Sequence, residues 1–381
     1  MLMHHDAREY ETAAKEAADW ALPKFKRVIE EGKANLTETI TKIAESHPQD
    51  AIVGARAFKF GSDEKGFGVK IPKIGHPISL HRHAIVQAAD RIGMPAMRST
   101  IDWMNSIPEG PQNLAKLFND HFHHQEKTKY LIRMVDGQIR GFLSDRYRRL
   151  NSGPIVEALM TAAASHGAMP VKAKCLDTKF DLKFIHPVLH EPIPNEYMLF
   201  GLKFRTSDFG NGGLLIGGFV HRLRCTNLMI TEDSFSQVHL GGRLSESLKF
   251  SEKTYQLDTE TVASAIEDVV RNVFAPEYVT KKMKIIKALA ETNVDADSII
   301  DGLTKKGKLT LGDSKEVKAL YSSADVEMLP PGQNMHRLTQ ALALFGGQQE
   351  VDKQEDFEQL SGEVAGLRVK QASSEANEVQ M

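Results

Sequence analysis

The sequence contains little cysteine, since only Cys175 and Cys225 occur among its 381 residues. Two cysteines cannot build the disulfide framework of a small secreted protein, so both are expected as free thiols in a reducing compartment. Hydrophobic residues make up 41% of the chain and charged residues 26%. This is the composition of a folded globular protein whose core needs neither disulfides nor a metal for stability.

Long hydrophobic runs and a dominant charge are also lacking. No apolar stretch approaches the roughly 18 residues of a membrane-spanning helix. The N-terminus has no basic segment followed by an apolar one, so no secretory signal is expected. We therefore predict a protein without a membrane partner, located in the cytoplasm of a bacterial host cell. The formal net charge is −2, so any electrostatic argument for a polyanionic partner must come from local charge clusters.

Several motifs of familiar chemistry are missing as well. The sequence has no HExxH, CxxC, GxxxxGK[ST] or GxSxG, which removes the usual signatures of zinc enzymes, P-loop proteins and serine hydrolases. The densest histidine clusters are His81 with His83, and His121 with His123 and His124. Their spacing allows only His121 and His124 to share a helix face. We predict no metal, no cofactor and no catalytic residue, and a non-enzymatic protein is favoured over an enzyme.

The hydrophobic pattern predicts a mixture of helices and strands. Residues 6–46 are expected to be helical, with a break near residue 22 because Pro23 suits the first turn of a helix. Asp136-Gly137 between two alternating runs is a strong signal for a hairpin of strands 129–135 and 138–143. Further helices are expected at 79–92, 111–124, 153–166, 262–274 and 279–290. Further strands are expected at 51–60, 67–74, 171–175, 179–185, 197–204 and 214–223.

This order predicts an α+β fold, with a mostly antiparallel sheet core over about residues 128–250 and helical N- and C-terminal regions. The glycine-rich run Gly210–Gly213 precedes a predicted strand, so a hairpin turn explains it better than a dinucleotide-binding loop. The expected parts are a helical region with a β-hairpin at 1–125, an α+β core domain at 126–275, a helical region at 276–350, and an acidic, partly disordered tail at 351–381.

The expected tail carries seven acidic and three basic residues. Acidic C-terminal segments of this kind bind protein partners, compete with nucleic acid for a basic groove, or serve only to keep a protein in solution. All three roles stay open at this point.

Two basic stretches with interleaved aromatic residues are the strongest functional signal. Residues 126–150 hold seven basic and three acidic residues, a net charge of +4, and a second basic group lies over 203–224. Binding of single-stranded nucleic acid requires cationic side chains that contact the phosphates and aromatic rings that stack on the bases. A solvated sheet face with ordinary salt bridges would give the same pattern. The predicted nucleic-acid-binding residues are Lys129, Tyr130, Arg133, Arg140, Arg146, Tyr147, Arg148, Arg149, Lys203, Arg205, Arg222 and Arg224.

Two elements in the middle of the chain resemble a family of phage and plasmid proteins named domain of unknown function nine-three-two. The first is a Ser-Asp-x-Tyr-x-x-Leu element at the end of a strand, and the second is a Cys-Thr-Asn element followed by Met. The matching residues are Ser144, Asp145, Tyr147, Leu150, Cys225, Thr226, Asn227 and Met229. A weaker match is His239 to Arg243, and the likeness covers roughly residues 130–275. The chain departs from the family at Arg149, often Pro, and at Leu228, usually Gly.

The resemblance implies a phage, prophage or plasmid origin, which favours a role in replication, recombination or host defence. The basic sheet is also similar, at the level of fold alone, to phage annealing proteins of the Red-beta and Erf type. We therefore expect a single-stranded DNA-binding or annealing protein that forms a homo-oligomer. Two alternatives stay open. One is an enzyme acting on nucleic acid or nucleotides, with Asp145, His186, His221 and Asn227 as first suspects. The other is a virion or host-inhibitor protein with a protein partner.

Overall fold

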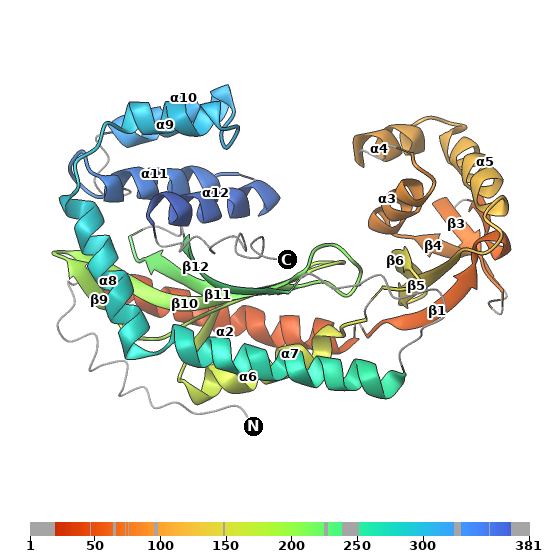
Figure 1. The fold of residues 1–381 in the computed structure, drawn as a ribbon, viewed down its shortest axis with the longest axis horizontal. Helices are drawn as coiled ribbons and strands as arrows, with labels where there is room; N and C mark the ends of the chain where they lie inside the picture. The colour runs from red at the N-terminus through yellow and green to blue at the C-terminus, as the bar shows by residue number, and fades with distance from the viewer. Residues whose placement is uncertain are drawn as a thin grey trace, which may run out of the picture.

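A computed structural model of the chain contains two units of mixed helix and strand (Figure 1). The structure describes residues 20–45, 47–63, 66–72, 74, 76–94, 98–147, 149–224, 228–237, 251–323, 329–349 and 351–366. Within these residues helices flank sheets whose strands are mainly antiparallel, so the predicted α+β class is confirmed. No helix in this part of the chain is long and apolar enough to cross a bilayer.

The first unit is a sheet with helices on one face, at the right of Figure 1. Its strand order is β1-β5-β6-β4-β3-β2. Its strands are β1 (Gln49–Gly54), β2 (Lys59–Asp63), β3 (Gly66–Lys70), β4 (Ile78–Leu80), β5 (Lys129–Val135) and β6 (Gln138–Ser144), and its helices are α3 (Arg82–Arg91), α4 (Arg98–Ser106) and α5 (Gly110–His123). Aromatic rings dominate the core between the sheet and the helices; Phe60, for example, packs on Phe118 and Phe122 with ring centroids 5.1 and 5.3 Å apart.

The second unit is built on a larger sheet with the order β12-β11-β10-β8-β7, and β9 pairs with β10. Its strands are β7 (Met169–Cys175), β8 (Phe180–Ile185), β9 (His190–Ile193), β10 (Glu196–Thr206), β11 (Leu214–Arg222) and β12 (Leu228–Gln237). Its helices are α2 (Ala21–Glu45), α6 (Ser152–Ser165), α7 (Glu252–Val273), α8 (Pro276–Glu291), α9 (Ala296–Lys305), α10 (Leu311–Ser322), α11 (Met335–Gly347) and α12 (Val351–Val364).

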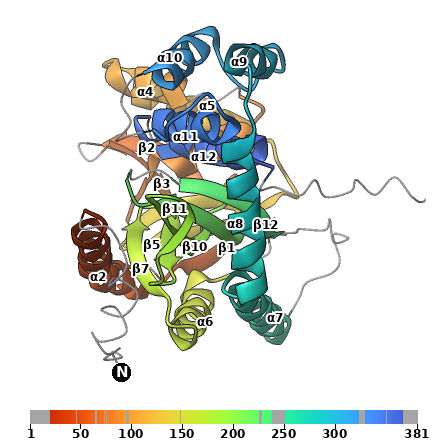
Figure 2. The same cartoon turned by 90° about the vertical axis from the view of Figure 1, so that its left-hand side faces the viewer.

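Helices cover both faces of this second sheet (Figure 2). α6 and α7 pack below it, where Leu202 and Phe204 of β10 contact Ile266 and Val270 of α7 in one apolar cluster. α11 and α12 lie over the opposite face, and α8 crosses one end of the sheet to connect the two layers. α2 lies along β7, the edge strand.

Most local predictions are confirmed. Asp136 and Gly137 have φ angles of 51° and 70°, the left-handed conformations that a two-residue hairpin turn between β5 and β6 requires. Gly210 and Gly212, with φ of 73° and 114°, form the predicted turn between β10 and β11. The helical break at Pro276 is present, since α7 ends at Val273 and α8 begins at the proline. The predicted helix before residue 20 lies outside the described residues.

The predicted strand 51–60 is wrong in its middle. A short 3-10 turn at Ala55–Ala57 separates β1 from β2, and these two strands occupy opposite edges of the first sheet. The predicted helix 79–92 begins later, at Arg82, because Ile78–Leu80 pairs as β4 and the His81 side chain caps the helix by accepting from the His83 backbone N–H.

The predicted single sheet core over 128–250 is two sheets. The β5–β6 hairpin belongs to the first sheet, where β5 pairs with β1 and β6 pairs in parallel with β4 through Leu80 and Ile139. The expected boundary near residue 125 therefore cuts through the first sheet. Because α2 packs on β7, the whole first unit is an insertion between these two elements of the second. Within the expected tail, α12 is a packed helix with Phe357 and Leu360 buried, and residues 367–381 lie outside the described chain.

Candidate anion-binding site

The predicted binding residues on β5 do not form an open surface. Tyr130 is 4% exposed, its ring lies 4.9 Å from the Phe142 ring, and its hydroxyl donates to Gln125 Oε1 over 2.6 Å. Arg133, on the other face of the strand, is 1% exposed. Lys129 at the start of β5 is exposed. Helices cover one face of β5 and the loop after β10 covers the other, which leaves no aromatic-basic face for a nucleic acid to contact.

Arg133 instead joins the two units. Its guanidinium donates to Asp50 Oδ1 at 2.8 Å, to the Asp208 carbonyl at 2.7 Å and to Asn151 Oδ1 at 2.7 Å. The Asp208 carboxylate accepts from the Ser152 backbone N–H and hydroxyl at 2.9 and 2.7 Å, and burial raises the pKa of this carboxyl. These bonds, of which the three to Asp208 are fully buried, hold β1, β5, the start of α6 and the loop after β10 together.

The loop after β6, with the motif that resembles the phage and plasmid family, connects the units. Its predicted turn is present, since the Tyr147 N–H donates to the Ser144 carbonyl at 2.9 Å. Tyr147 lies against Gly210 of the second unit, and burial raises the pKa of its hydroxyl. The Arg149 guanidinium lies 3.5 Å from Asp50 and 4.8 Å over the Tyr255 ring. Arg146 is half-buried, and Arg148 lies outside the described residues.

The other predicted arginines also contact groups of the protein itself. Arg222 is fully buried and forms a bidentate pair with Glu196, with N–O distances of 2.5 and 2.8 Å. Arg224 stacks 4.1 Å over the Trp20 ring. Arg140 donates to the Asp177 carbonyl at 3.3 Å. A buried charge is stable only with a partner, and the partners of these three arginines lie within the protein. The structure therefore does not support the three arginines as exposed phosphate contacts.

Lys203 and Arg205 are different, because they join cations that the sequence prediction missed. Lys172 on β7, Lys183 on β8 and Lys203 on β10 are successive partners across three adjacent antiparallel strands. A second row, two residues along, runs from Lys174 through Asp181 to Arg205. Residues two apart on a strand share a face, so the five cations lie together. We call Lys172, Lys174, Lys183, Lys203 and Arg205 the cation cluster.

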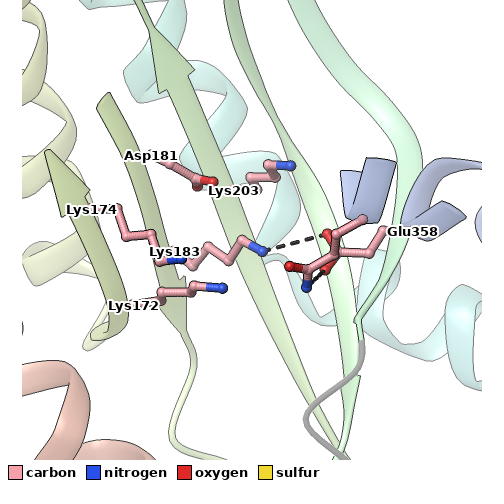
Figure 3. A pocket seen from close by; sticks show the side chains of 7 residues that line it. Lys172, Lys174, Asp181, Lys183, Lys203 and Glu358 are labelled. Carbon is pink, nitrogen blue, oxygen red and sulfur yellow. Dashed lines mark hydrogen bonds and ion pairs between the residues drawn. The ribbon is translucent and has the colours of Figure 1, made fainter. Parts of the chain in front are cut away.

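The four lysines of the cation cluster lie on the face of the second sheet that α12 approaches (Figure 3). The side chains of Lys172, Lys174, Lys183 and Lys203 line a small cavity of about 10 Å³, together with Asp181 and with Gln354 and Glu358 of α12. Glu358 Oε2 lies 3.5 Å from Lys183 Nζ, and Gln354 donates to the other Glu358 oxygen at 2.8 Å. Among the side chains that the structure describes at this place, five cations thus face two carboxylates, a net charge of +3.

Burial and mutual repulsion act on these amines. Lys203 is 2% exposed, and burial lowers its pKa to about 8, against the attraction of Asp181 and with further lowering by Lys183. Burial also lowers the pKa of Lys172, and Lys183 and Lys174 add to the effect. Like charges directly opposite each other destabilise a sheet, and a buried amine costs more than an exposed one. An anion bound among these amines would offset both costs.

A sequence signal for the cluster existed. Lys172 and Lys174, and Asp181 and Lys183, each stand two apart in a predicted strand, so each of these pairs had to share a face. Lys203 lies in the predicted strand 197–204, and Arg205 follows the end of that strand by one residue. Whether these residues faced the same way depended on which strands were neighbours and in which register. That information is not local to any of these segments.

The residues suspected for an enzyme are not brought together as a site. Asp145 is exposed on the loop after β6, whereas His221 is buried in β11 of the second sheet, where burial lowers its pKa to about 4. His186 follows β8, and Asn227 lies outside the described residues. Cys175 is a free thiol whose pKa is raised by burial. Among the residues that the structure describes, no group of His, Cys, Asp and Glu could hold a metal ion.

No protein-family model, curated protein or solved structure matches this chain. The resemblance to the phage and plasmid family therefore stays a prediction from the residues quoted for it.

Proposed function

We propose that this protein binds single-stranded nucleic acid, and that the cation cluster contacts the phosphates. The observation that carries the proposal is the pair of rows on β7, β8 and β10, which place five cations on one face of the sheet, with a net charge of +3 among the described side chains. Charge-assisted hydrogen bonds from lysine and arginine to phosphate are strong and need no particular base. The proposal includes a phage or plasmid origin, a place in the host cytoplasm, and a role in annealing as an oligomer.

The cluster has the layout that a phosphate chain requires. Neighbouring strands lie about 4.8 Å apart, so a row across three strands presents cations at short, regular intervals. Lys172, Lys174 and Arg205 are half-buried and form the accessible rim, whereas Lys183 and Lys203 lie deeper. A backbone phosphate at the rim would be attracted by both layers. The proposal thus moves the expected interface from residues 126–150 to the second sheet.

The test is a fluorescence-polarisation titration with a labelled single-stranded oligonucleotide at low and moderate salt. Each phosphate contact contributes about 0.7 to the slope of log affinity against log salt for a single strand. We expect Lys172→Ala/Lys174→Ala to weaken binding and to reduce this slope by about 1.4. The matched control is Lys281→Ala/Lys284→Ala, which removes two exposed lysines from α8.

Two results would overturn the proposal. One is the absence of binding by the unaltered protein even at low salt. The other is an equal loss of affinity in the Lys172/Lys174 variant and in the α8 control, because the contacts would then be spread over the surface rather than gathered on the second sheet.

A further inference from the structure

One carboxylate of α12 pairs with the cation cluster. Glu358 is 1% exposed, and its Oε2 atom lies 3.5 Å from Lys183 Nζ (Figure 3). Its other oxygen accepts from Gln354 at 2.8 Å. A carboxylate carries its charge on oxygen atoms, as a phosphate does, and lysine pairs with either group. Glu358 therefore occupies a position among these cations that suits a phosphate.

Two faces of α12 differ in their contacts. Phe357 and Leu360 belong to an apolar cluster with residues of α9, α10 and α11, and the Phe357 ring lies 4.8 Å from the Phe345 ring. Gln354 and Glu358 line the cavity over the sheet. Residues i and i+4 share a helix face, so α12 is anchored on α11 by apolar contacts and meets the cation cluster through polar groups.

Apolar contacts with the second sheet lie beyond the C-terminal end of α12. Ala365, which follows the helix, belongs to an apolar cluster with Met198 and Phe200 of β10 and Val220 of β11. Glu358 stands seven residues before Ala365, which is about 10 Å along a helix axis. The polar contact over the cation cluster can therefore open while this apolar contact stays in place.

Opening the polar contact exchanges one ion pair for another. Glu358 would leave Lys183 and enter water, and a phosphate would take its place beside the ammonium. Loss of one partner from a buried ion pair is costly because the remaining charge has no compensation. Both charges are compensated after this exchange, so its cost is small. An apolar contact in the same place would lose its burial with nothing in return.

We propose that α12 is an autoinhibitory element in which Glu358 takes the place of a phosphate, and that single-stranded nucleic acid binds fully by displacing this carboxylate. The inference rests on the proposed function, because the same cations are assigned there to phosphates. Lys183 lies beneath α12 with a side chain that is 4% exposed. The cavity of about 10 Å³ beside it has room for roughly one water. With α12 in place, a strand therefore reaches Lys172 and Lys174 at the rim but not Lys183.

The test compares Glu358→Gln with Asp356→Asn in a fluorescence-polarisation titration with a labelled single-stranded oligonucleotide. Both changes remove one negative charge from α12, but Asp356 is exposed. Glutamine keeps the size of Glu358 and competes less with a phosphate, because it carries no charge. Glu358→Gln should bind about tenfold more tightly than the unaltered protein, the lower end of what a charge-assisted hydrogen bond contributes. Asp356→Asn should change the affinity by less than about twofold, because water and salt screen an exposed charge.

Hydrogen exchange of the unaltered protein is a second measurement, which needs no variant. Release of α12 from the sheet leaves this helix less protected, so the amides of residues 354–364 should exchange faster with the oligonucleotide bound than without it. Slower or unchanged exchange overturns the proposal, because a strand that binds beside a fixed helix protects its amides or leaves them as they were.

The affinities separate the inference from the proposed function. Equal affinities of Glu358→Gln and the unaltered protein overturn the inference, and so do equal gains in Glu358→Gln and Asp356→Asn. The proposed function still stands in either case if Lys172→Ala/Lys174→Ala weakens binding. If neither the unaltered protein nor Glu358→Gln binds the oligonucleotide, the proposed function fails and the inference fails with it. Circular dichroism checks that both variants of α12 are folded.

Discussion

Replacing Arg133 by methionine separates two roles that this residue could have. As a phosphate contact, its loss would weaken oligonucleotide binding and leave stability unchanged. As the buried link between the units, its loss would leave Asp50, the Asp208 carbonyl and Asn151 without their shared donor. The structure supports the second role, since the guanidinium is 1% exposed.

The magnitude follows from the acceptors that lose their donor. The Asp50 side chain is 19% exposed and keeps Arg149 at 3.5 Å, so its charge stays compensated by water and by this arginine. The Asp208 carbonyl and Asn151 Oδ1 lose their bonds from Arg133, and a buried acceptor without a partner costs about 1–3 kcal/mol. The free energy of unfolding of Arg133→Met should therefore fall by about 3 kcal/mol.

Urea denaturation followed by circular dichroism measures this change. The matched control is Lys129→Met, which removes an exposed cation from the same strand and should change the free energy of unfolding by less than about 0.5 kcal/mol. The reasoning would be refuted if Arg133→Met unfolded at the same urea concentration as the unaltered protein, above all if it also lost affinity for the oligonucleotide.

Two further predictions concern the core of the second unit. Burial lowers the pKa of His221 to about 4 and that of His336 to about 3, so both are neutral in the fold while the unfolded chain takes up protons below pH 6.5. The free energy of unfolding is therefore highest above pH 6.5. It falls as the pH drops toward 4, by about 3 kcal/mol for His221 alone. Urea titrations at pH 7, 6 and 5 should show this loss, and a His221→Gln variant with an unchanged pH slope would contradict it. Gly201→Ala would place a Cβ 2.4 Å from the Phe184 carbonyl oxygen and should lower the free energy of unfolding by about 1–3 kcal/mol. Gly61→Ala, where a Cβ meets nothing within 4 Å, is the control, and equal thermal shifts in both variants would count against close packing as the cause.

Local structure was predictable from the sequence, and the assembly of the sheets was not. Asp136-Gly137 specified its hairpin because only a few residue types adopt two successive positive φ angles. The parallel pairing of Leu80 with Ile139 could not be predicted from the sequence. The residue pattern of a strand is the same whichever strand lies beside it. The insertion of one unit into the other was missed for the same reason.

The candidate site shows the same limit. Counting charges over 126–150 found the basic residues but not their partners, since Arg133 bonds to Asp50, 83 residues earlier. The real cation cluster draws its members from three strands, and Lys183 and Lys203 come together only when β8 and β10 pair. Charge density along the chain is thus a poor guide to charge density in space.

The insertion of the first unit also bears on the order in which the chain folds. During synthesis α2 emerges before the first unit, yet its packing partner β7 emerges only after that unit is complete. Asp50, near the entry of the inserted unit, contacts Arg133 and Arg149, the latter near its exit. Once this unit has folded, its two ends are fixed close together, and the loop that α2 must close to reach β7 becomes short. Because the entropy of loop closure grows with loop length, we expect the inserted unit to fold first and to act as the template on which the split second unit is completed.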